Sequence, residues 1–100
     1  MTGKRGMKGL DIESLPYRIR VYSNNQVLIP AKLIRRLGIQ DVKEAYVVFK
    51  FRENSIKIHV RLLRTKYTDS RQFTIPKDIR EKYNILPGDE VEIIEITPVK

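Results

Sequence analysis

Residues 72–85 read QFTIPKDIREKYNI, and residues 26–39, at a spacing of 46 positions, read QVLIPAKLIRRLGI. In each stretch an apolar strand runs into Ile-Pro, a short amphipathic helix follows, and a residue suited to a left-handed turn precedes an isoleucine. Pro30 and Pro76 stand where the helices are expected to begin, because proline is favoured at the first helical position, where its missing N–H would have no partner. The two stretches are therefore predicted to form the same supersecondary unit.

The helix ends and the flanking residues keep this 46-residue register. Gly38 and Asn84 stand where the helices are expected to end, because both residue types can adopt the positive φ of a C-terminal cap. Flanking positions match at the same spacing, in the pairs Arg18–Arg64, Arg20–Lys66, Gln26–Gln72, Arg36–Lys82 and Glu44–Glu90. A repeat this short cannot bury its own apolar face, so the two copies are expected to pack on each other.

The second copy carries the more specific motif. Ile75-Pro76 is followed by Ile79-Arg80, and residues 86–91 read LPGDEV. This combination resembles the SpoVT/AbrB family of swapped-hairpin DNA-binding domains, and the first copy is similar to it through QVLIPAKLIRRLGI. The resemblance implies an all-β fold with two short helices, in the form of an AbrB-like swapped-hairpin (double-split) β-barrel built by two tandem repeats.

Residue alternation gives the expected organisation of the chain. Residues 1–16 are predicted to be a flexible basic N-terminal arm, residues 17–62 the first AbrB-like repeat, and residues 63–100 the second. Strands are expected over residues 17–22, 27–29, 45–51, 56–62, 63–67, 73–75 and 91–96. The apolar phase changes at Leu62–Leu63, which predicts a bulge or bend at the seam between the repeats.

Composition favours a nucleic-acid partner. The net charge is +8, and residues 17–62 hold ten Lys and Arg against three Asp and Glu, whereas residues 63–100 hold seven of each. A basic excess of this kind is typical of nucleic-acid binding, although a basic surface also serves solubility. The chain has no cysteine and no apolar run long enough for a membrane span, so we expect a cytoplasmic protein without a membrane partner.

Basic residues repeat on the first strand of each copy. Arg18 and Arg20 lie on one side of their predicted strand, and Arg64 and Lys66 on one side of the equivalent strand. If a pseudo-twofold axis relates the copies, these groups fall on one surface, which suits the repeating phosphates of duplex DNA. The alternative is a charged sheet edge that prevents aggregation.

The family resemblance implies specific contacts. In AbrB-like domains, basic residues on the first strand, before the second strand and early in the helix contact DNA. Here the position before the second strand holds glutamine in both copies, with Arg71 as a neighbouring substitute. The implied DNA-binding set is Arg18, Arg20, Gln26, Arg35, Arg36, Arg64, Lys66, Arg71, Gln72 and Arg80. Such domains pair two chains, so the tandem chain is expected to form an intrachain pseudo-dimer or a homodimer.

Signals for catalysis are lacking in the sequence. The single histidine, His59, lies between Lys57 and Arg61 on a predicted strand, and there is no Cys/His metal set, Gly-rich phosphate loop or nucleophile elbow. We therefore expect no enzyme activity, catalytic residue, metal or cofactor. The leading interpretation is a DNA-binding transcriptional regulator. The alternatives are an antitoxin-type module that binds a toxin protein as well as DNA, and a small basic RNA-binding barrel.

Overall fold

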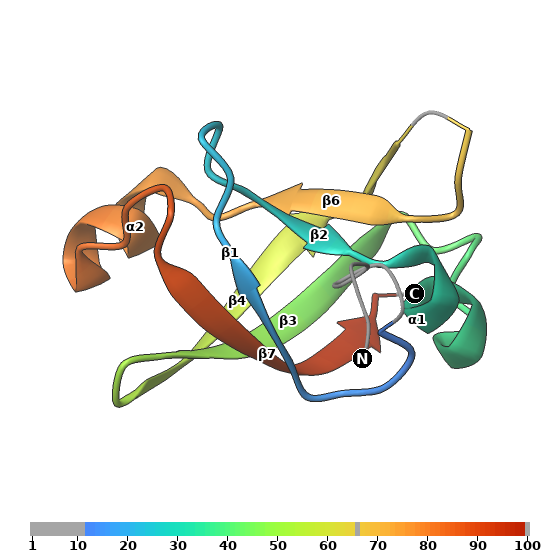
Figure 1. The fold of residues 1–100 in the computed structure, drawn as a ribbon, viewed down its shortest axis with the longest axis horizontal. Coiled ribbons are helices and arrows are strands. Elements are labelled where there is room, and N and C mark those ends of the chain that lie inside the picture. Colours follow the sequence, from blue (N-terminus) through green and yellow to red (C-terminus); the bar gives the residue numbers. More distant parts are fainter. Residues whose placement is uncertain (1–11, 66, 100) are drawn as a thin grey trace, which may run out of the picture.

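The computed structural model describes residues 12–65 and 67–99, which form seven strands and two helices (Figure 1). In chain order these are β1 (Tyr17–Arg20), β2 (Gln26–Ile29), α1 (Ala31–Leu37), β3 (Glu44–Phe51), β4 (Asn54–Arg61), β5 (Leu63–Arg64), β6 (Arg71–Thr74), α2 (Lys77–Tyr83) and β7 (Glu90–Pro98). The predicted arm over residues 1–16 lies mostly outside the described residues, as do Lys66 and Lys100. Neither described helix is long and apolar enough to cross a membrane.

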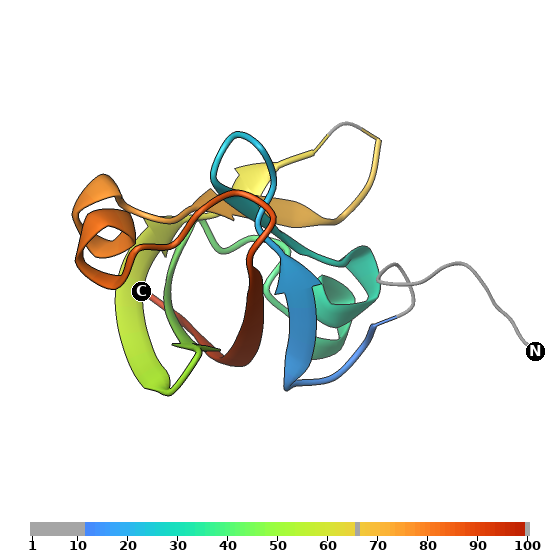
Figure 2. The same ribbon diagram turned by 60° about the vertical axis from the view of Figure 1, so that its left-hand side comes forward.

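The strands form two antiparallel sheets. One sheet has the order β1-β7-β3-β4, and the other has the order β2-β6-β5. The smaller sheet lies over the larger one, with α1 and α2 at opposite ends of the molecule (Figures 1 and 2). The mostly β fold with two short helices agrees with the sequence prediction. The sheets do not join into one closed barrel, so the double-split barrel itself is not established.

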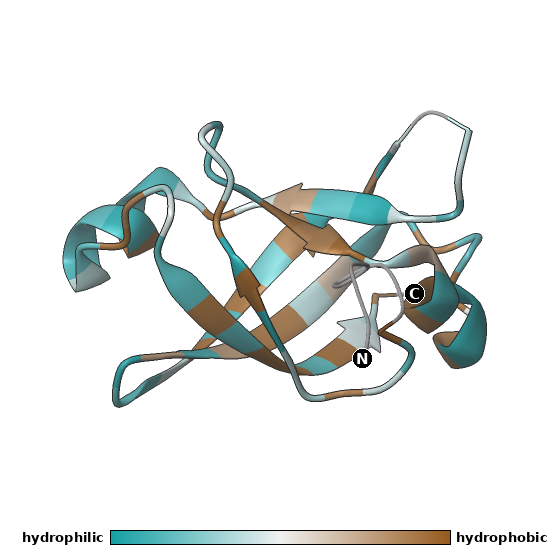
Figure 3. Ribbon diagram, viewed as in Figure 1, coloured by the Kyte–Doolittle hydropathy of each residue, from teal (hydrophilic) through white to brown (hydrophobic). Residues whose placement is uncertain are grey.

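The core lies between the two sheets and follows from residue alternation. On β3, every second residue from Ala45 to Phe51 is buried, and on β4 Ile56, Ile58 and Val60 are buried. Figure 3 shows the resulting alternation of apolar and polar bands along these strands. Each fully buried side chain of this size contributes about 1.5–3 kcal/mol of transfer free energy, so this packing is the main source of stability.

Both helices begin one residue later than expected. α1 starts after Pro30, which has φ −61° and ψ 151°, and α2 starts after Pro76, which has φ −57° and ψ 146°. These extended conformations place each proline outside the helix, where its carbonyl oxygen accepts the first helical hydrogen bond. The donors are the backbone N–H groups of Ile34, at 3.1 Å, and Arg80, at 3.0 Å. Proline here precedes the first helical position rather than filling it.

The helix ends and the following turn match the sequence prediction. Gly38 and Asn84 adopt left-handed conformations, with φ values of 67° and 59°. After α2, Gly88 has a φ of 93°, and the backbone N–H of Asp89 donates to the carbonyl oxygen of Leu86 at 3.0 Å. These features could be predicted because the backbone conformation that each residue prefers depends on the residue itself and its immediate neighbours.

The strand pairing around β2 and β6 centres on two residues that are 46 positions apart. Val27 lies opposite Phe73, and both side chains are fully buried. The ladder continues symmetrically on either side, with Gln26 opposite Thr74 and Leu28 opposite Gln72. The 46-residue register of the sequence therefore reappears as an antiparallel ladder, although this pairing by itself does not establish two tandem copies.

The two halves use their first strands differently. β1 pairs with β7 instead of with β2, which follows it in the sequence. β5, in contrast, pairs with β6, which follows it in the sequence. β4 pairs with the side of β3 that faces away from β7. The Tyr17 hydroxyl on β1 donates to the carbonyl oxygen of Leu28 on β2 at 2.8 Å, which joins the two sheets. β1 and β5 consequently belong to different sheets.

The first strand of each predicted repeat is shorter than expected. β1 ends at Arg20, and β5 contains only Leu63 and Arg64. The predicted interruption is present at Leu62, which belongs to no strand. Its side chain is buried and its backbone N–H donates to the carbonyl oxygen of Lys43 at 2.8 Å. The assignment of residues 17–62 and 63–100 to separate repeats stays a prediction.

Candidate functional site

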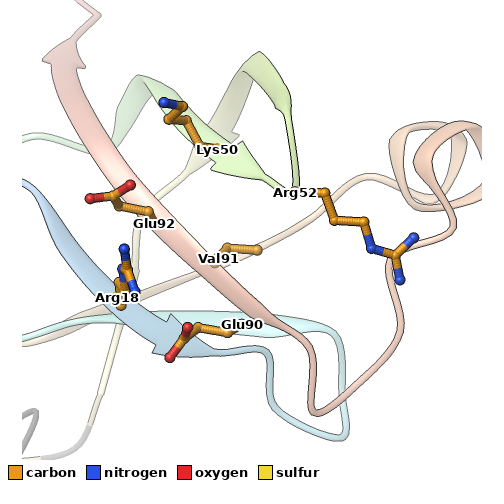
Figure 4. A pocket seen from close by; sticks show the side chains of 6 residues that line it. All are labelled: Arg18, Lys50, Arg52, Glu90, Val91 and Glu92. Atoms are coloured by element: carbon orange, nitrogen blue, oxygen red, sulfur yellow. The ribbon is translucent and has the colours of Figure 1, made fainter.

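Arg18 lies on the outer face of the four-stranded sheet, beside acidic residues. The ladder places it opposite Glu92. Figure 4 shows the side chain of Arg18 between Glu90 and Glu92, in a shallow hollow of about 270 Å³ that Lys50 and Arg52 also line. The same figure shows Arg52 pointing away from the two glutamates. The positive charge of Arg18 is therefore partly offset by its neighbours.

The basic strands do not form one surface, which corrects the sequence expectation. Arg20, like Arg18, faces outward from the four-stranded sheet, opposite Glu90, and its Nη1 donates to the carbonyl oxygen of Gly88 at 3.3 Å. Arg64 lies on β5 in the other sheet, and Lys66 lies outside the described residues. The physical reason is the pairing of β1 with β7, which carries the first-strand arginines away from β5.

The helix arginines are engaged in local contacts. Arg35 Nη1 lies 3.0 Å from Asp69 Oδ2, and Arg36 Nη1 lies 3.5 Å from Glu13 Oε1. Arg80 is half-buried, and its Nε donates at 2.9 Å to a main-chain carbonyl five residues earlier. The two ion pairs are exposed, where such pairs contribute little free energy, so Arg35 and Arg36 are free to exchange partners.

Arg71 is a structural residue, which corrects its expected role as a DNA contact. Its side chain is only 1% exposed. Nη1 donates to the carbonyl oxygens of Asp69, at 2.6 Å, and Ser70, at 3.1 Å, while Nη2 donates to that of Gln40, at 2.6 Å. Burial, with a smaller effect from Arg64, lowers the pKa of the guanidinium. A phosphate cannot reach a group enclosed in this way.

The two glutamines of the predicted set share one face. Gln26 and Gln72 project from the outer side of the β2–β6 pair, where Gln26 Nε2 donates to Thr74 Oγ1 at 3.3 Å. Leu28, Gln72 and Leu63 lie side by side across the three strands. We call the outer surface formed by Gln26, Leu28, Leu63, Gln72 and Thr74 the ribbon face. It is uncharged, and each glutamine is related to the other by the symmetric register.

Two loops border the ribbon face. The turn between β1 and β2 and the loop between β5 and β6 both rise on the side of the three-stranded sheet (Figures 1 and 2). In the second loop Tyr67 is fully exposed and has a φ of 66°. The Thr65 Oγ1 and Thr68 Oγ1 atoms of that loop are 2.8 Å apart, and both approach Ser70 Oγ.

A basic groove adjoins the ribbon face at one end. It has a volume of about 420 Å³ and lies between residues 40–43 and residues 61–64. Lys43, Arg61 and Arg64 are exposed at its walls. Of these three exposed residues, the sequence prediction included only Arg64, although Arg61 and Arg64 flank the predicted seam at Leu62–Leu63.

The remaining residues with possible site chemistry are the metal-ligand types and the single histidine. Within residues 12–65 and 67–99, no group of His, Asp and Glu is arranged to hold a metal ion. His59 is half exposed on the outer face of β4, with Nε2 2.8 Å from Glu44 Oε1 and its ring 5.0 Å from that of Tyr46. Those contacts orient the imidazole on the sheet surface.

Comparison with known proteins gives one relationship. Residues 64–98 match the bacterial antitoxin family described as antidote-toxin recognition MazE. This family belongs to the AbrB/MazE superfamily of swapped-hairpin domains. The MazE-like segment contains β6, α2 and β7 and therefore includes Gln72, whereas residues 1–63 lie outside it. Neither a curated protein nor a solved structure matches the chain.

Proposed function

We propose that this protein is a DNA-binding transcriptional regulator of the AbrB/MazE type that reads duplex DNA with the ribbon face. The observation that carries the proposal is the placement of Gln26 and Gln72 on one outer surface, symmetrically about the Val27–Phe73 pair. The MazE-like segment over residues 64–98 and the net charge of +8 support it. The protein acts by binding, without catalysis, metal or cofactor.

The chemistry of the ribbon face suits base edges. Glutamine can donate to and accept from adenine in the major groove, and the apolar parts of Leu28 and Thr74 can contact a thymine methyl group. The major groove is about 12 Å wide and admits two paired β-strands. Because β2 and β6 are antiparallel and symmetric about their centre, the two glutamines address two half-sites of opposite orientation.

The same ladder supports an intrachain pseudo-dimer. In this proposal residues 17–62 and 63–100 are two copies of one strand–helix module, and their second strands pair about a pseudo-twofold axis at Val27 and Phe73. All four strands of the order β1-β7-β3-β4 come from one chain, so the sheet forms without a strand from a second copy. The expected species in the cytoplasm is a single chain bound to DNA.

A titration of labelled duplex DNA tests the proposal. Fluorescence anisotropy of a 20-base-pair duplex of random sequence should show binding whose logarithmic affinity falls linearly with the logarithm of salt concentration, by about 0.9 for each phosphate contacted. Selection of tight binders from the random pool should enrich adenine at inverted positions. Binding that ignores salt, or stronger binding to single-stranded RNA than to the duplex, would contradict the proposal.

An antitoxin role is the second candidate. It is favoured by the family description of residues 64–98, antidote-toxin recognition. In this role the protein holds a toxin protein and also binds DNA. Co-expression of a tagged chain with the protein encoded by the adjacent gene tests it, and the expected result is a co-purifying complex that relieves growth arrest. Growth arrest that persists despite co-expression would count against the role.

A further inference from the structure

We propose that the groove between residues 40–43 and 61–64 binds a backbone phosphate of the duplex, on one side of the ribbon face only. This inference rests on the proposed DNA-binding function. It assigns phosphate contacts to Lys43 and Arg61 together with Arg64.

The groove is rigid because main-chain and buried contacts hold both walls. Arg71 forms part of its lining and donates through Nη2 to the carbonyl oxygen of Gln40 at 2.6 Å. On the same walls, the backbone N–H of Leu62 donates to the carbonyl oxygen of Lys43 at 2.8 Å. A site held in this way needs little reorganisation to receive a ligand, which favours binding.

The charge at the groove is poorly balanced. Among the described residues, no carboxylate lies within salt-bridge distance of Lys43, Arg61 or Arg64. The ladder places Glu44 opposite Arg61, but the carboxylate of Glu44 contacts His59 instead, at 2.8 Å. Asp41 is the single acidic residue of the lining.

Cations placed close together repel one another, and a bound anion relieves that repulsion. Inside the groove, burial and the nearby charge of Arg64 lower the pKa of Arg71, while Asp69 and Asp41 oppose this shift. An excess of positive charge at the walls also concentrates anions from solution. The preferred ligand is therefore an oxyanion that accepts several hydrogen bonds, such as a phosphate.

The position of the groove selects a phosphate of the DNA backbone. Leu63 lines the groove and lies directly opposite Gln72 of the ribbon face, and Arg64 lies opposite Arg71. The groove borders the ribbon face through Leu63, and in this proposal a duplex whose bases contact Gln72 runs its backbone along this edge of β5. Contacts of this type fix the position of the protein along the duplex without reading sequence.

In the 46-residue register, the segment equivalent to residues 40–43 carries no cation. Residues 86–89, which stand 46 positions after residues 40–43, read Leu-Pro-Gly-Asp. This turn contains no cation, and Asp89 adds a negative charge where Lys43 adds a positive one. The bases are read symmetrically, but the backbone is held more strongly at the first end.

Two double variants of equal charge test the groove. Lys43→Ala with Arg61→Ala should reduce the slope of log affinity against log salt by about 1 and weaken binding to all sequences alike. Lys50→Ala with Arg52→Ala, on the four-stranded sheet, removes the same charge and should leave the slope near the wild-type value. Circular dichroism of both variants verifies that they fold. A wild-type slope in the first variant, or equal losses in both, would overturn the phosphate site.

Two further measurements separate the possible failures. Hydroxyl-radical footprinting of the wild-type complex should show protection that extends farther on one side of the inverted site, and a symmetric footprint would overturn the one-sided arrangement. Titration with inorganic phosphate should shift backbone amide NMR signals of residues 61–64 only weakly, whereas saturation at micromolar phosphate would assign the groove to a free anion instead. If wild-type protein does not bind duplex DNA, the proposed function fails together with this site. If the wild-type protein binds duplex DNA and the groove variant binds it with the same salt dependence, only the phosphate site is refuted.

Discussion

The guanidinium of Arg71 donates to the carbonyl oxygen of Gln40 over 2.6 Å, a bond between β6 and the segment that joins α1 to β3. The same side chain satisfies the carbonyl oxygens of Asp69 and Ser70. It is the largest fully buried side chain in the described part of the molecule. A buried charge is tolerated when hydrogen bonds satisfy it, and here all its observed acceptors are main-chain groups, of which that of Gln40 lines the basic groove.

Replacement of this residue should destabilise the fold. Arg71→Met keeps a long side chain but removes the donor of the Asp69 and Gln40 carbonyl oxygens, while the Ser70 carbonyl oxygen still accepts from Thr65. The free energy of unfolding in urea should fall by about 3 kcal/mol, because each unsatisfied buried acceptor costs roughly 1–3 kcal/mol and the costs are not additive. The exposed control Arg64→Met should change stability by less than about 0.5 kcal/mol. Equal stability of the two variants would show that the guanidinium is dispensable to the fold.

Tyr17 should increase the free energy of unfolding at neutral pH and lose this contribution in strong alkali. Its hydroxyl is buried and donates to the carbonyl oxygen of Leu28, and burial, with a smaller contribution from Tyr22, raises its pKa above the ordinary value. In the unfolded chain Tyr17 loses its proton near pH 10, whereas in the folded protein it keeps it. The unfolded state therefore binds fewer protons above that pH, and stability falls as the pH rises.

Tyr17→Phe isolates this contribution. At pH 7 the variant should lose about 1 kcal/mol, the net value of one hydrogen bond, with the acceptor left unpaired. Between pH 10 and 11, the wild-type protein should lose about 1 kcal/mol more than the variant does, because only part of the unfolded chain is deprotonated at the lower pH. Urea unfolding at a series of pH values gives both numbers. Parallel pH profiles for the two proteins would mean that Tyr17 titrates normally.

Local sequence signals predicted the turns and helix ends well. Gly38 and Asn84 adopt positive φ, and the strand is interrupted at Leu62, as predicted. Each of these features depends on a few neighbouring residues, so the sequence alone indicates it. The two prolines predicted the helix starts to within one residue. Their exact position depends on whether the proline is extended or helical, and both are extended here.

Non-local pairing limited the prediction of the site. The 46-residue spacing does not reveal that β1 pairs with β7 while β5 stays with β6, so Arg18 and Arg64 were expected on one surface. The predicted strand began at residue 73 and Arg71 was expected to contact DNA, although Arg71 is in phase with the buried Phe73 on the same strand. The alternation with Phe73 was the available signal that Arg71 is buried, but the charge of Arg71 favoured an exposed position.

The two glutamines of the ribbon face should matter equally for specific binding. Gln26→Ala and Gln72→Ala should each weaken binding to a selected inverted site by about 1–3 kcal/mol, the usual value of a bidentate base contact. Binding to unrelated duplex DNA and its salt dependence should stay unchanged, because neither side chain carries charge. Asn54→Ala, on the edge of the other sheet, is the matched control.

Anisotropy titrations against both duplexes measure these effects. An equal loss of affinity for selected and unrelated DNA would contradict base reading by the glutamines. A loss confined to Gln72→Ala would contradict the symmetric arrangement, because the ladder gives the two residues equivalent positions.

Arg64 should contribute more to DNA binding than Arg18, although both are exposed first-strand arginines in the 46-residue register. Arg18 lies opposite Glu92 on the four-stranded sheet, whereas Arg64 lies in the sheet that carries the ribbon face and lines the basic groove. Arg64→Ala should therefore reduce the salt slope by about 1, and Arg18→Ala should leave it nearly unchanged. The two variants remove the same charge, so the overall field of the protein falls equally in both. If Arg18→Ala gives the larger loss in the titration, the DNA lies against the four-stranded sheet and the ribbon face is not the reading surface.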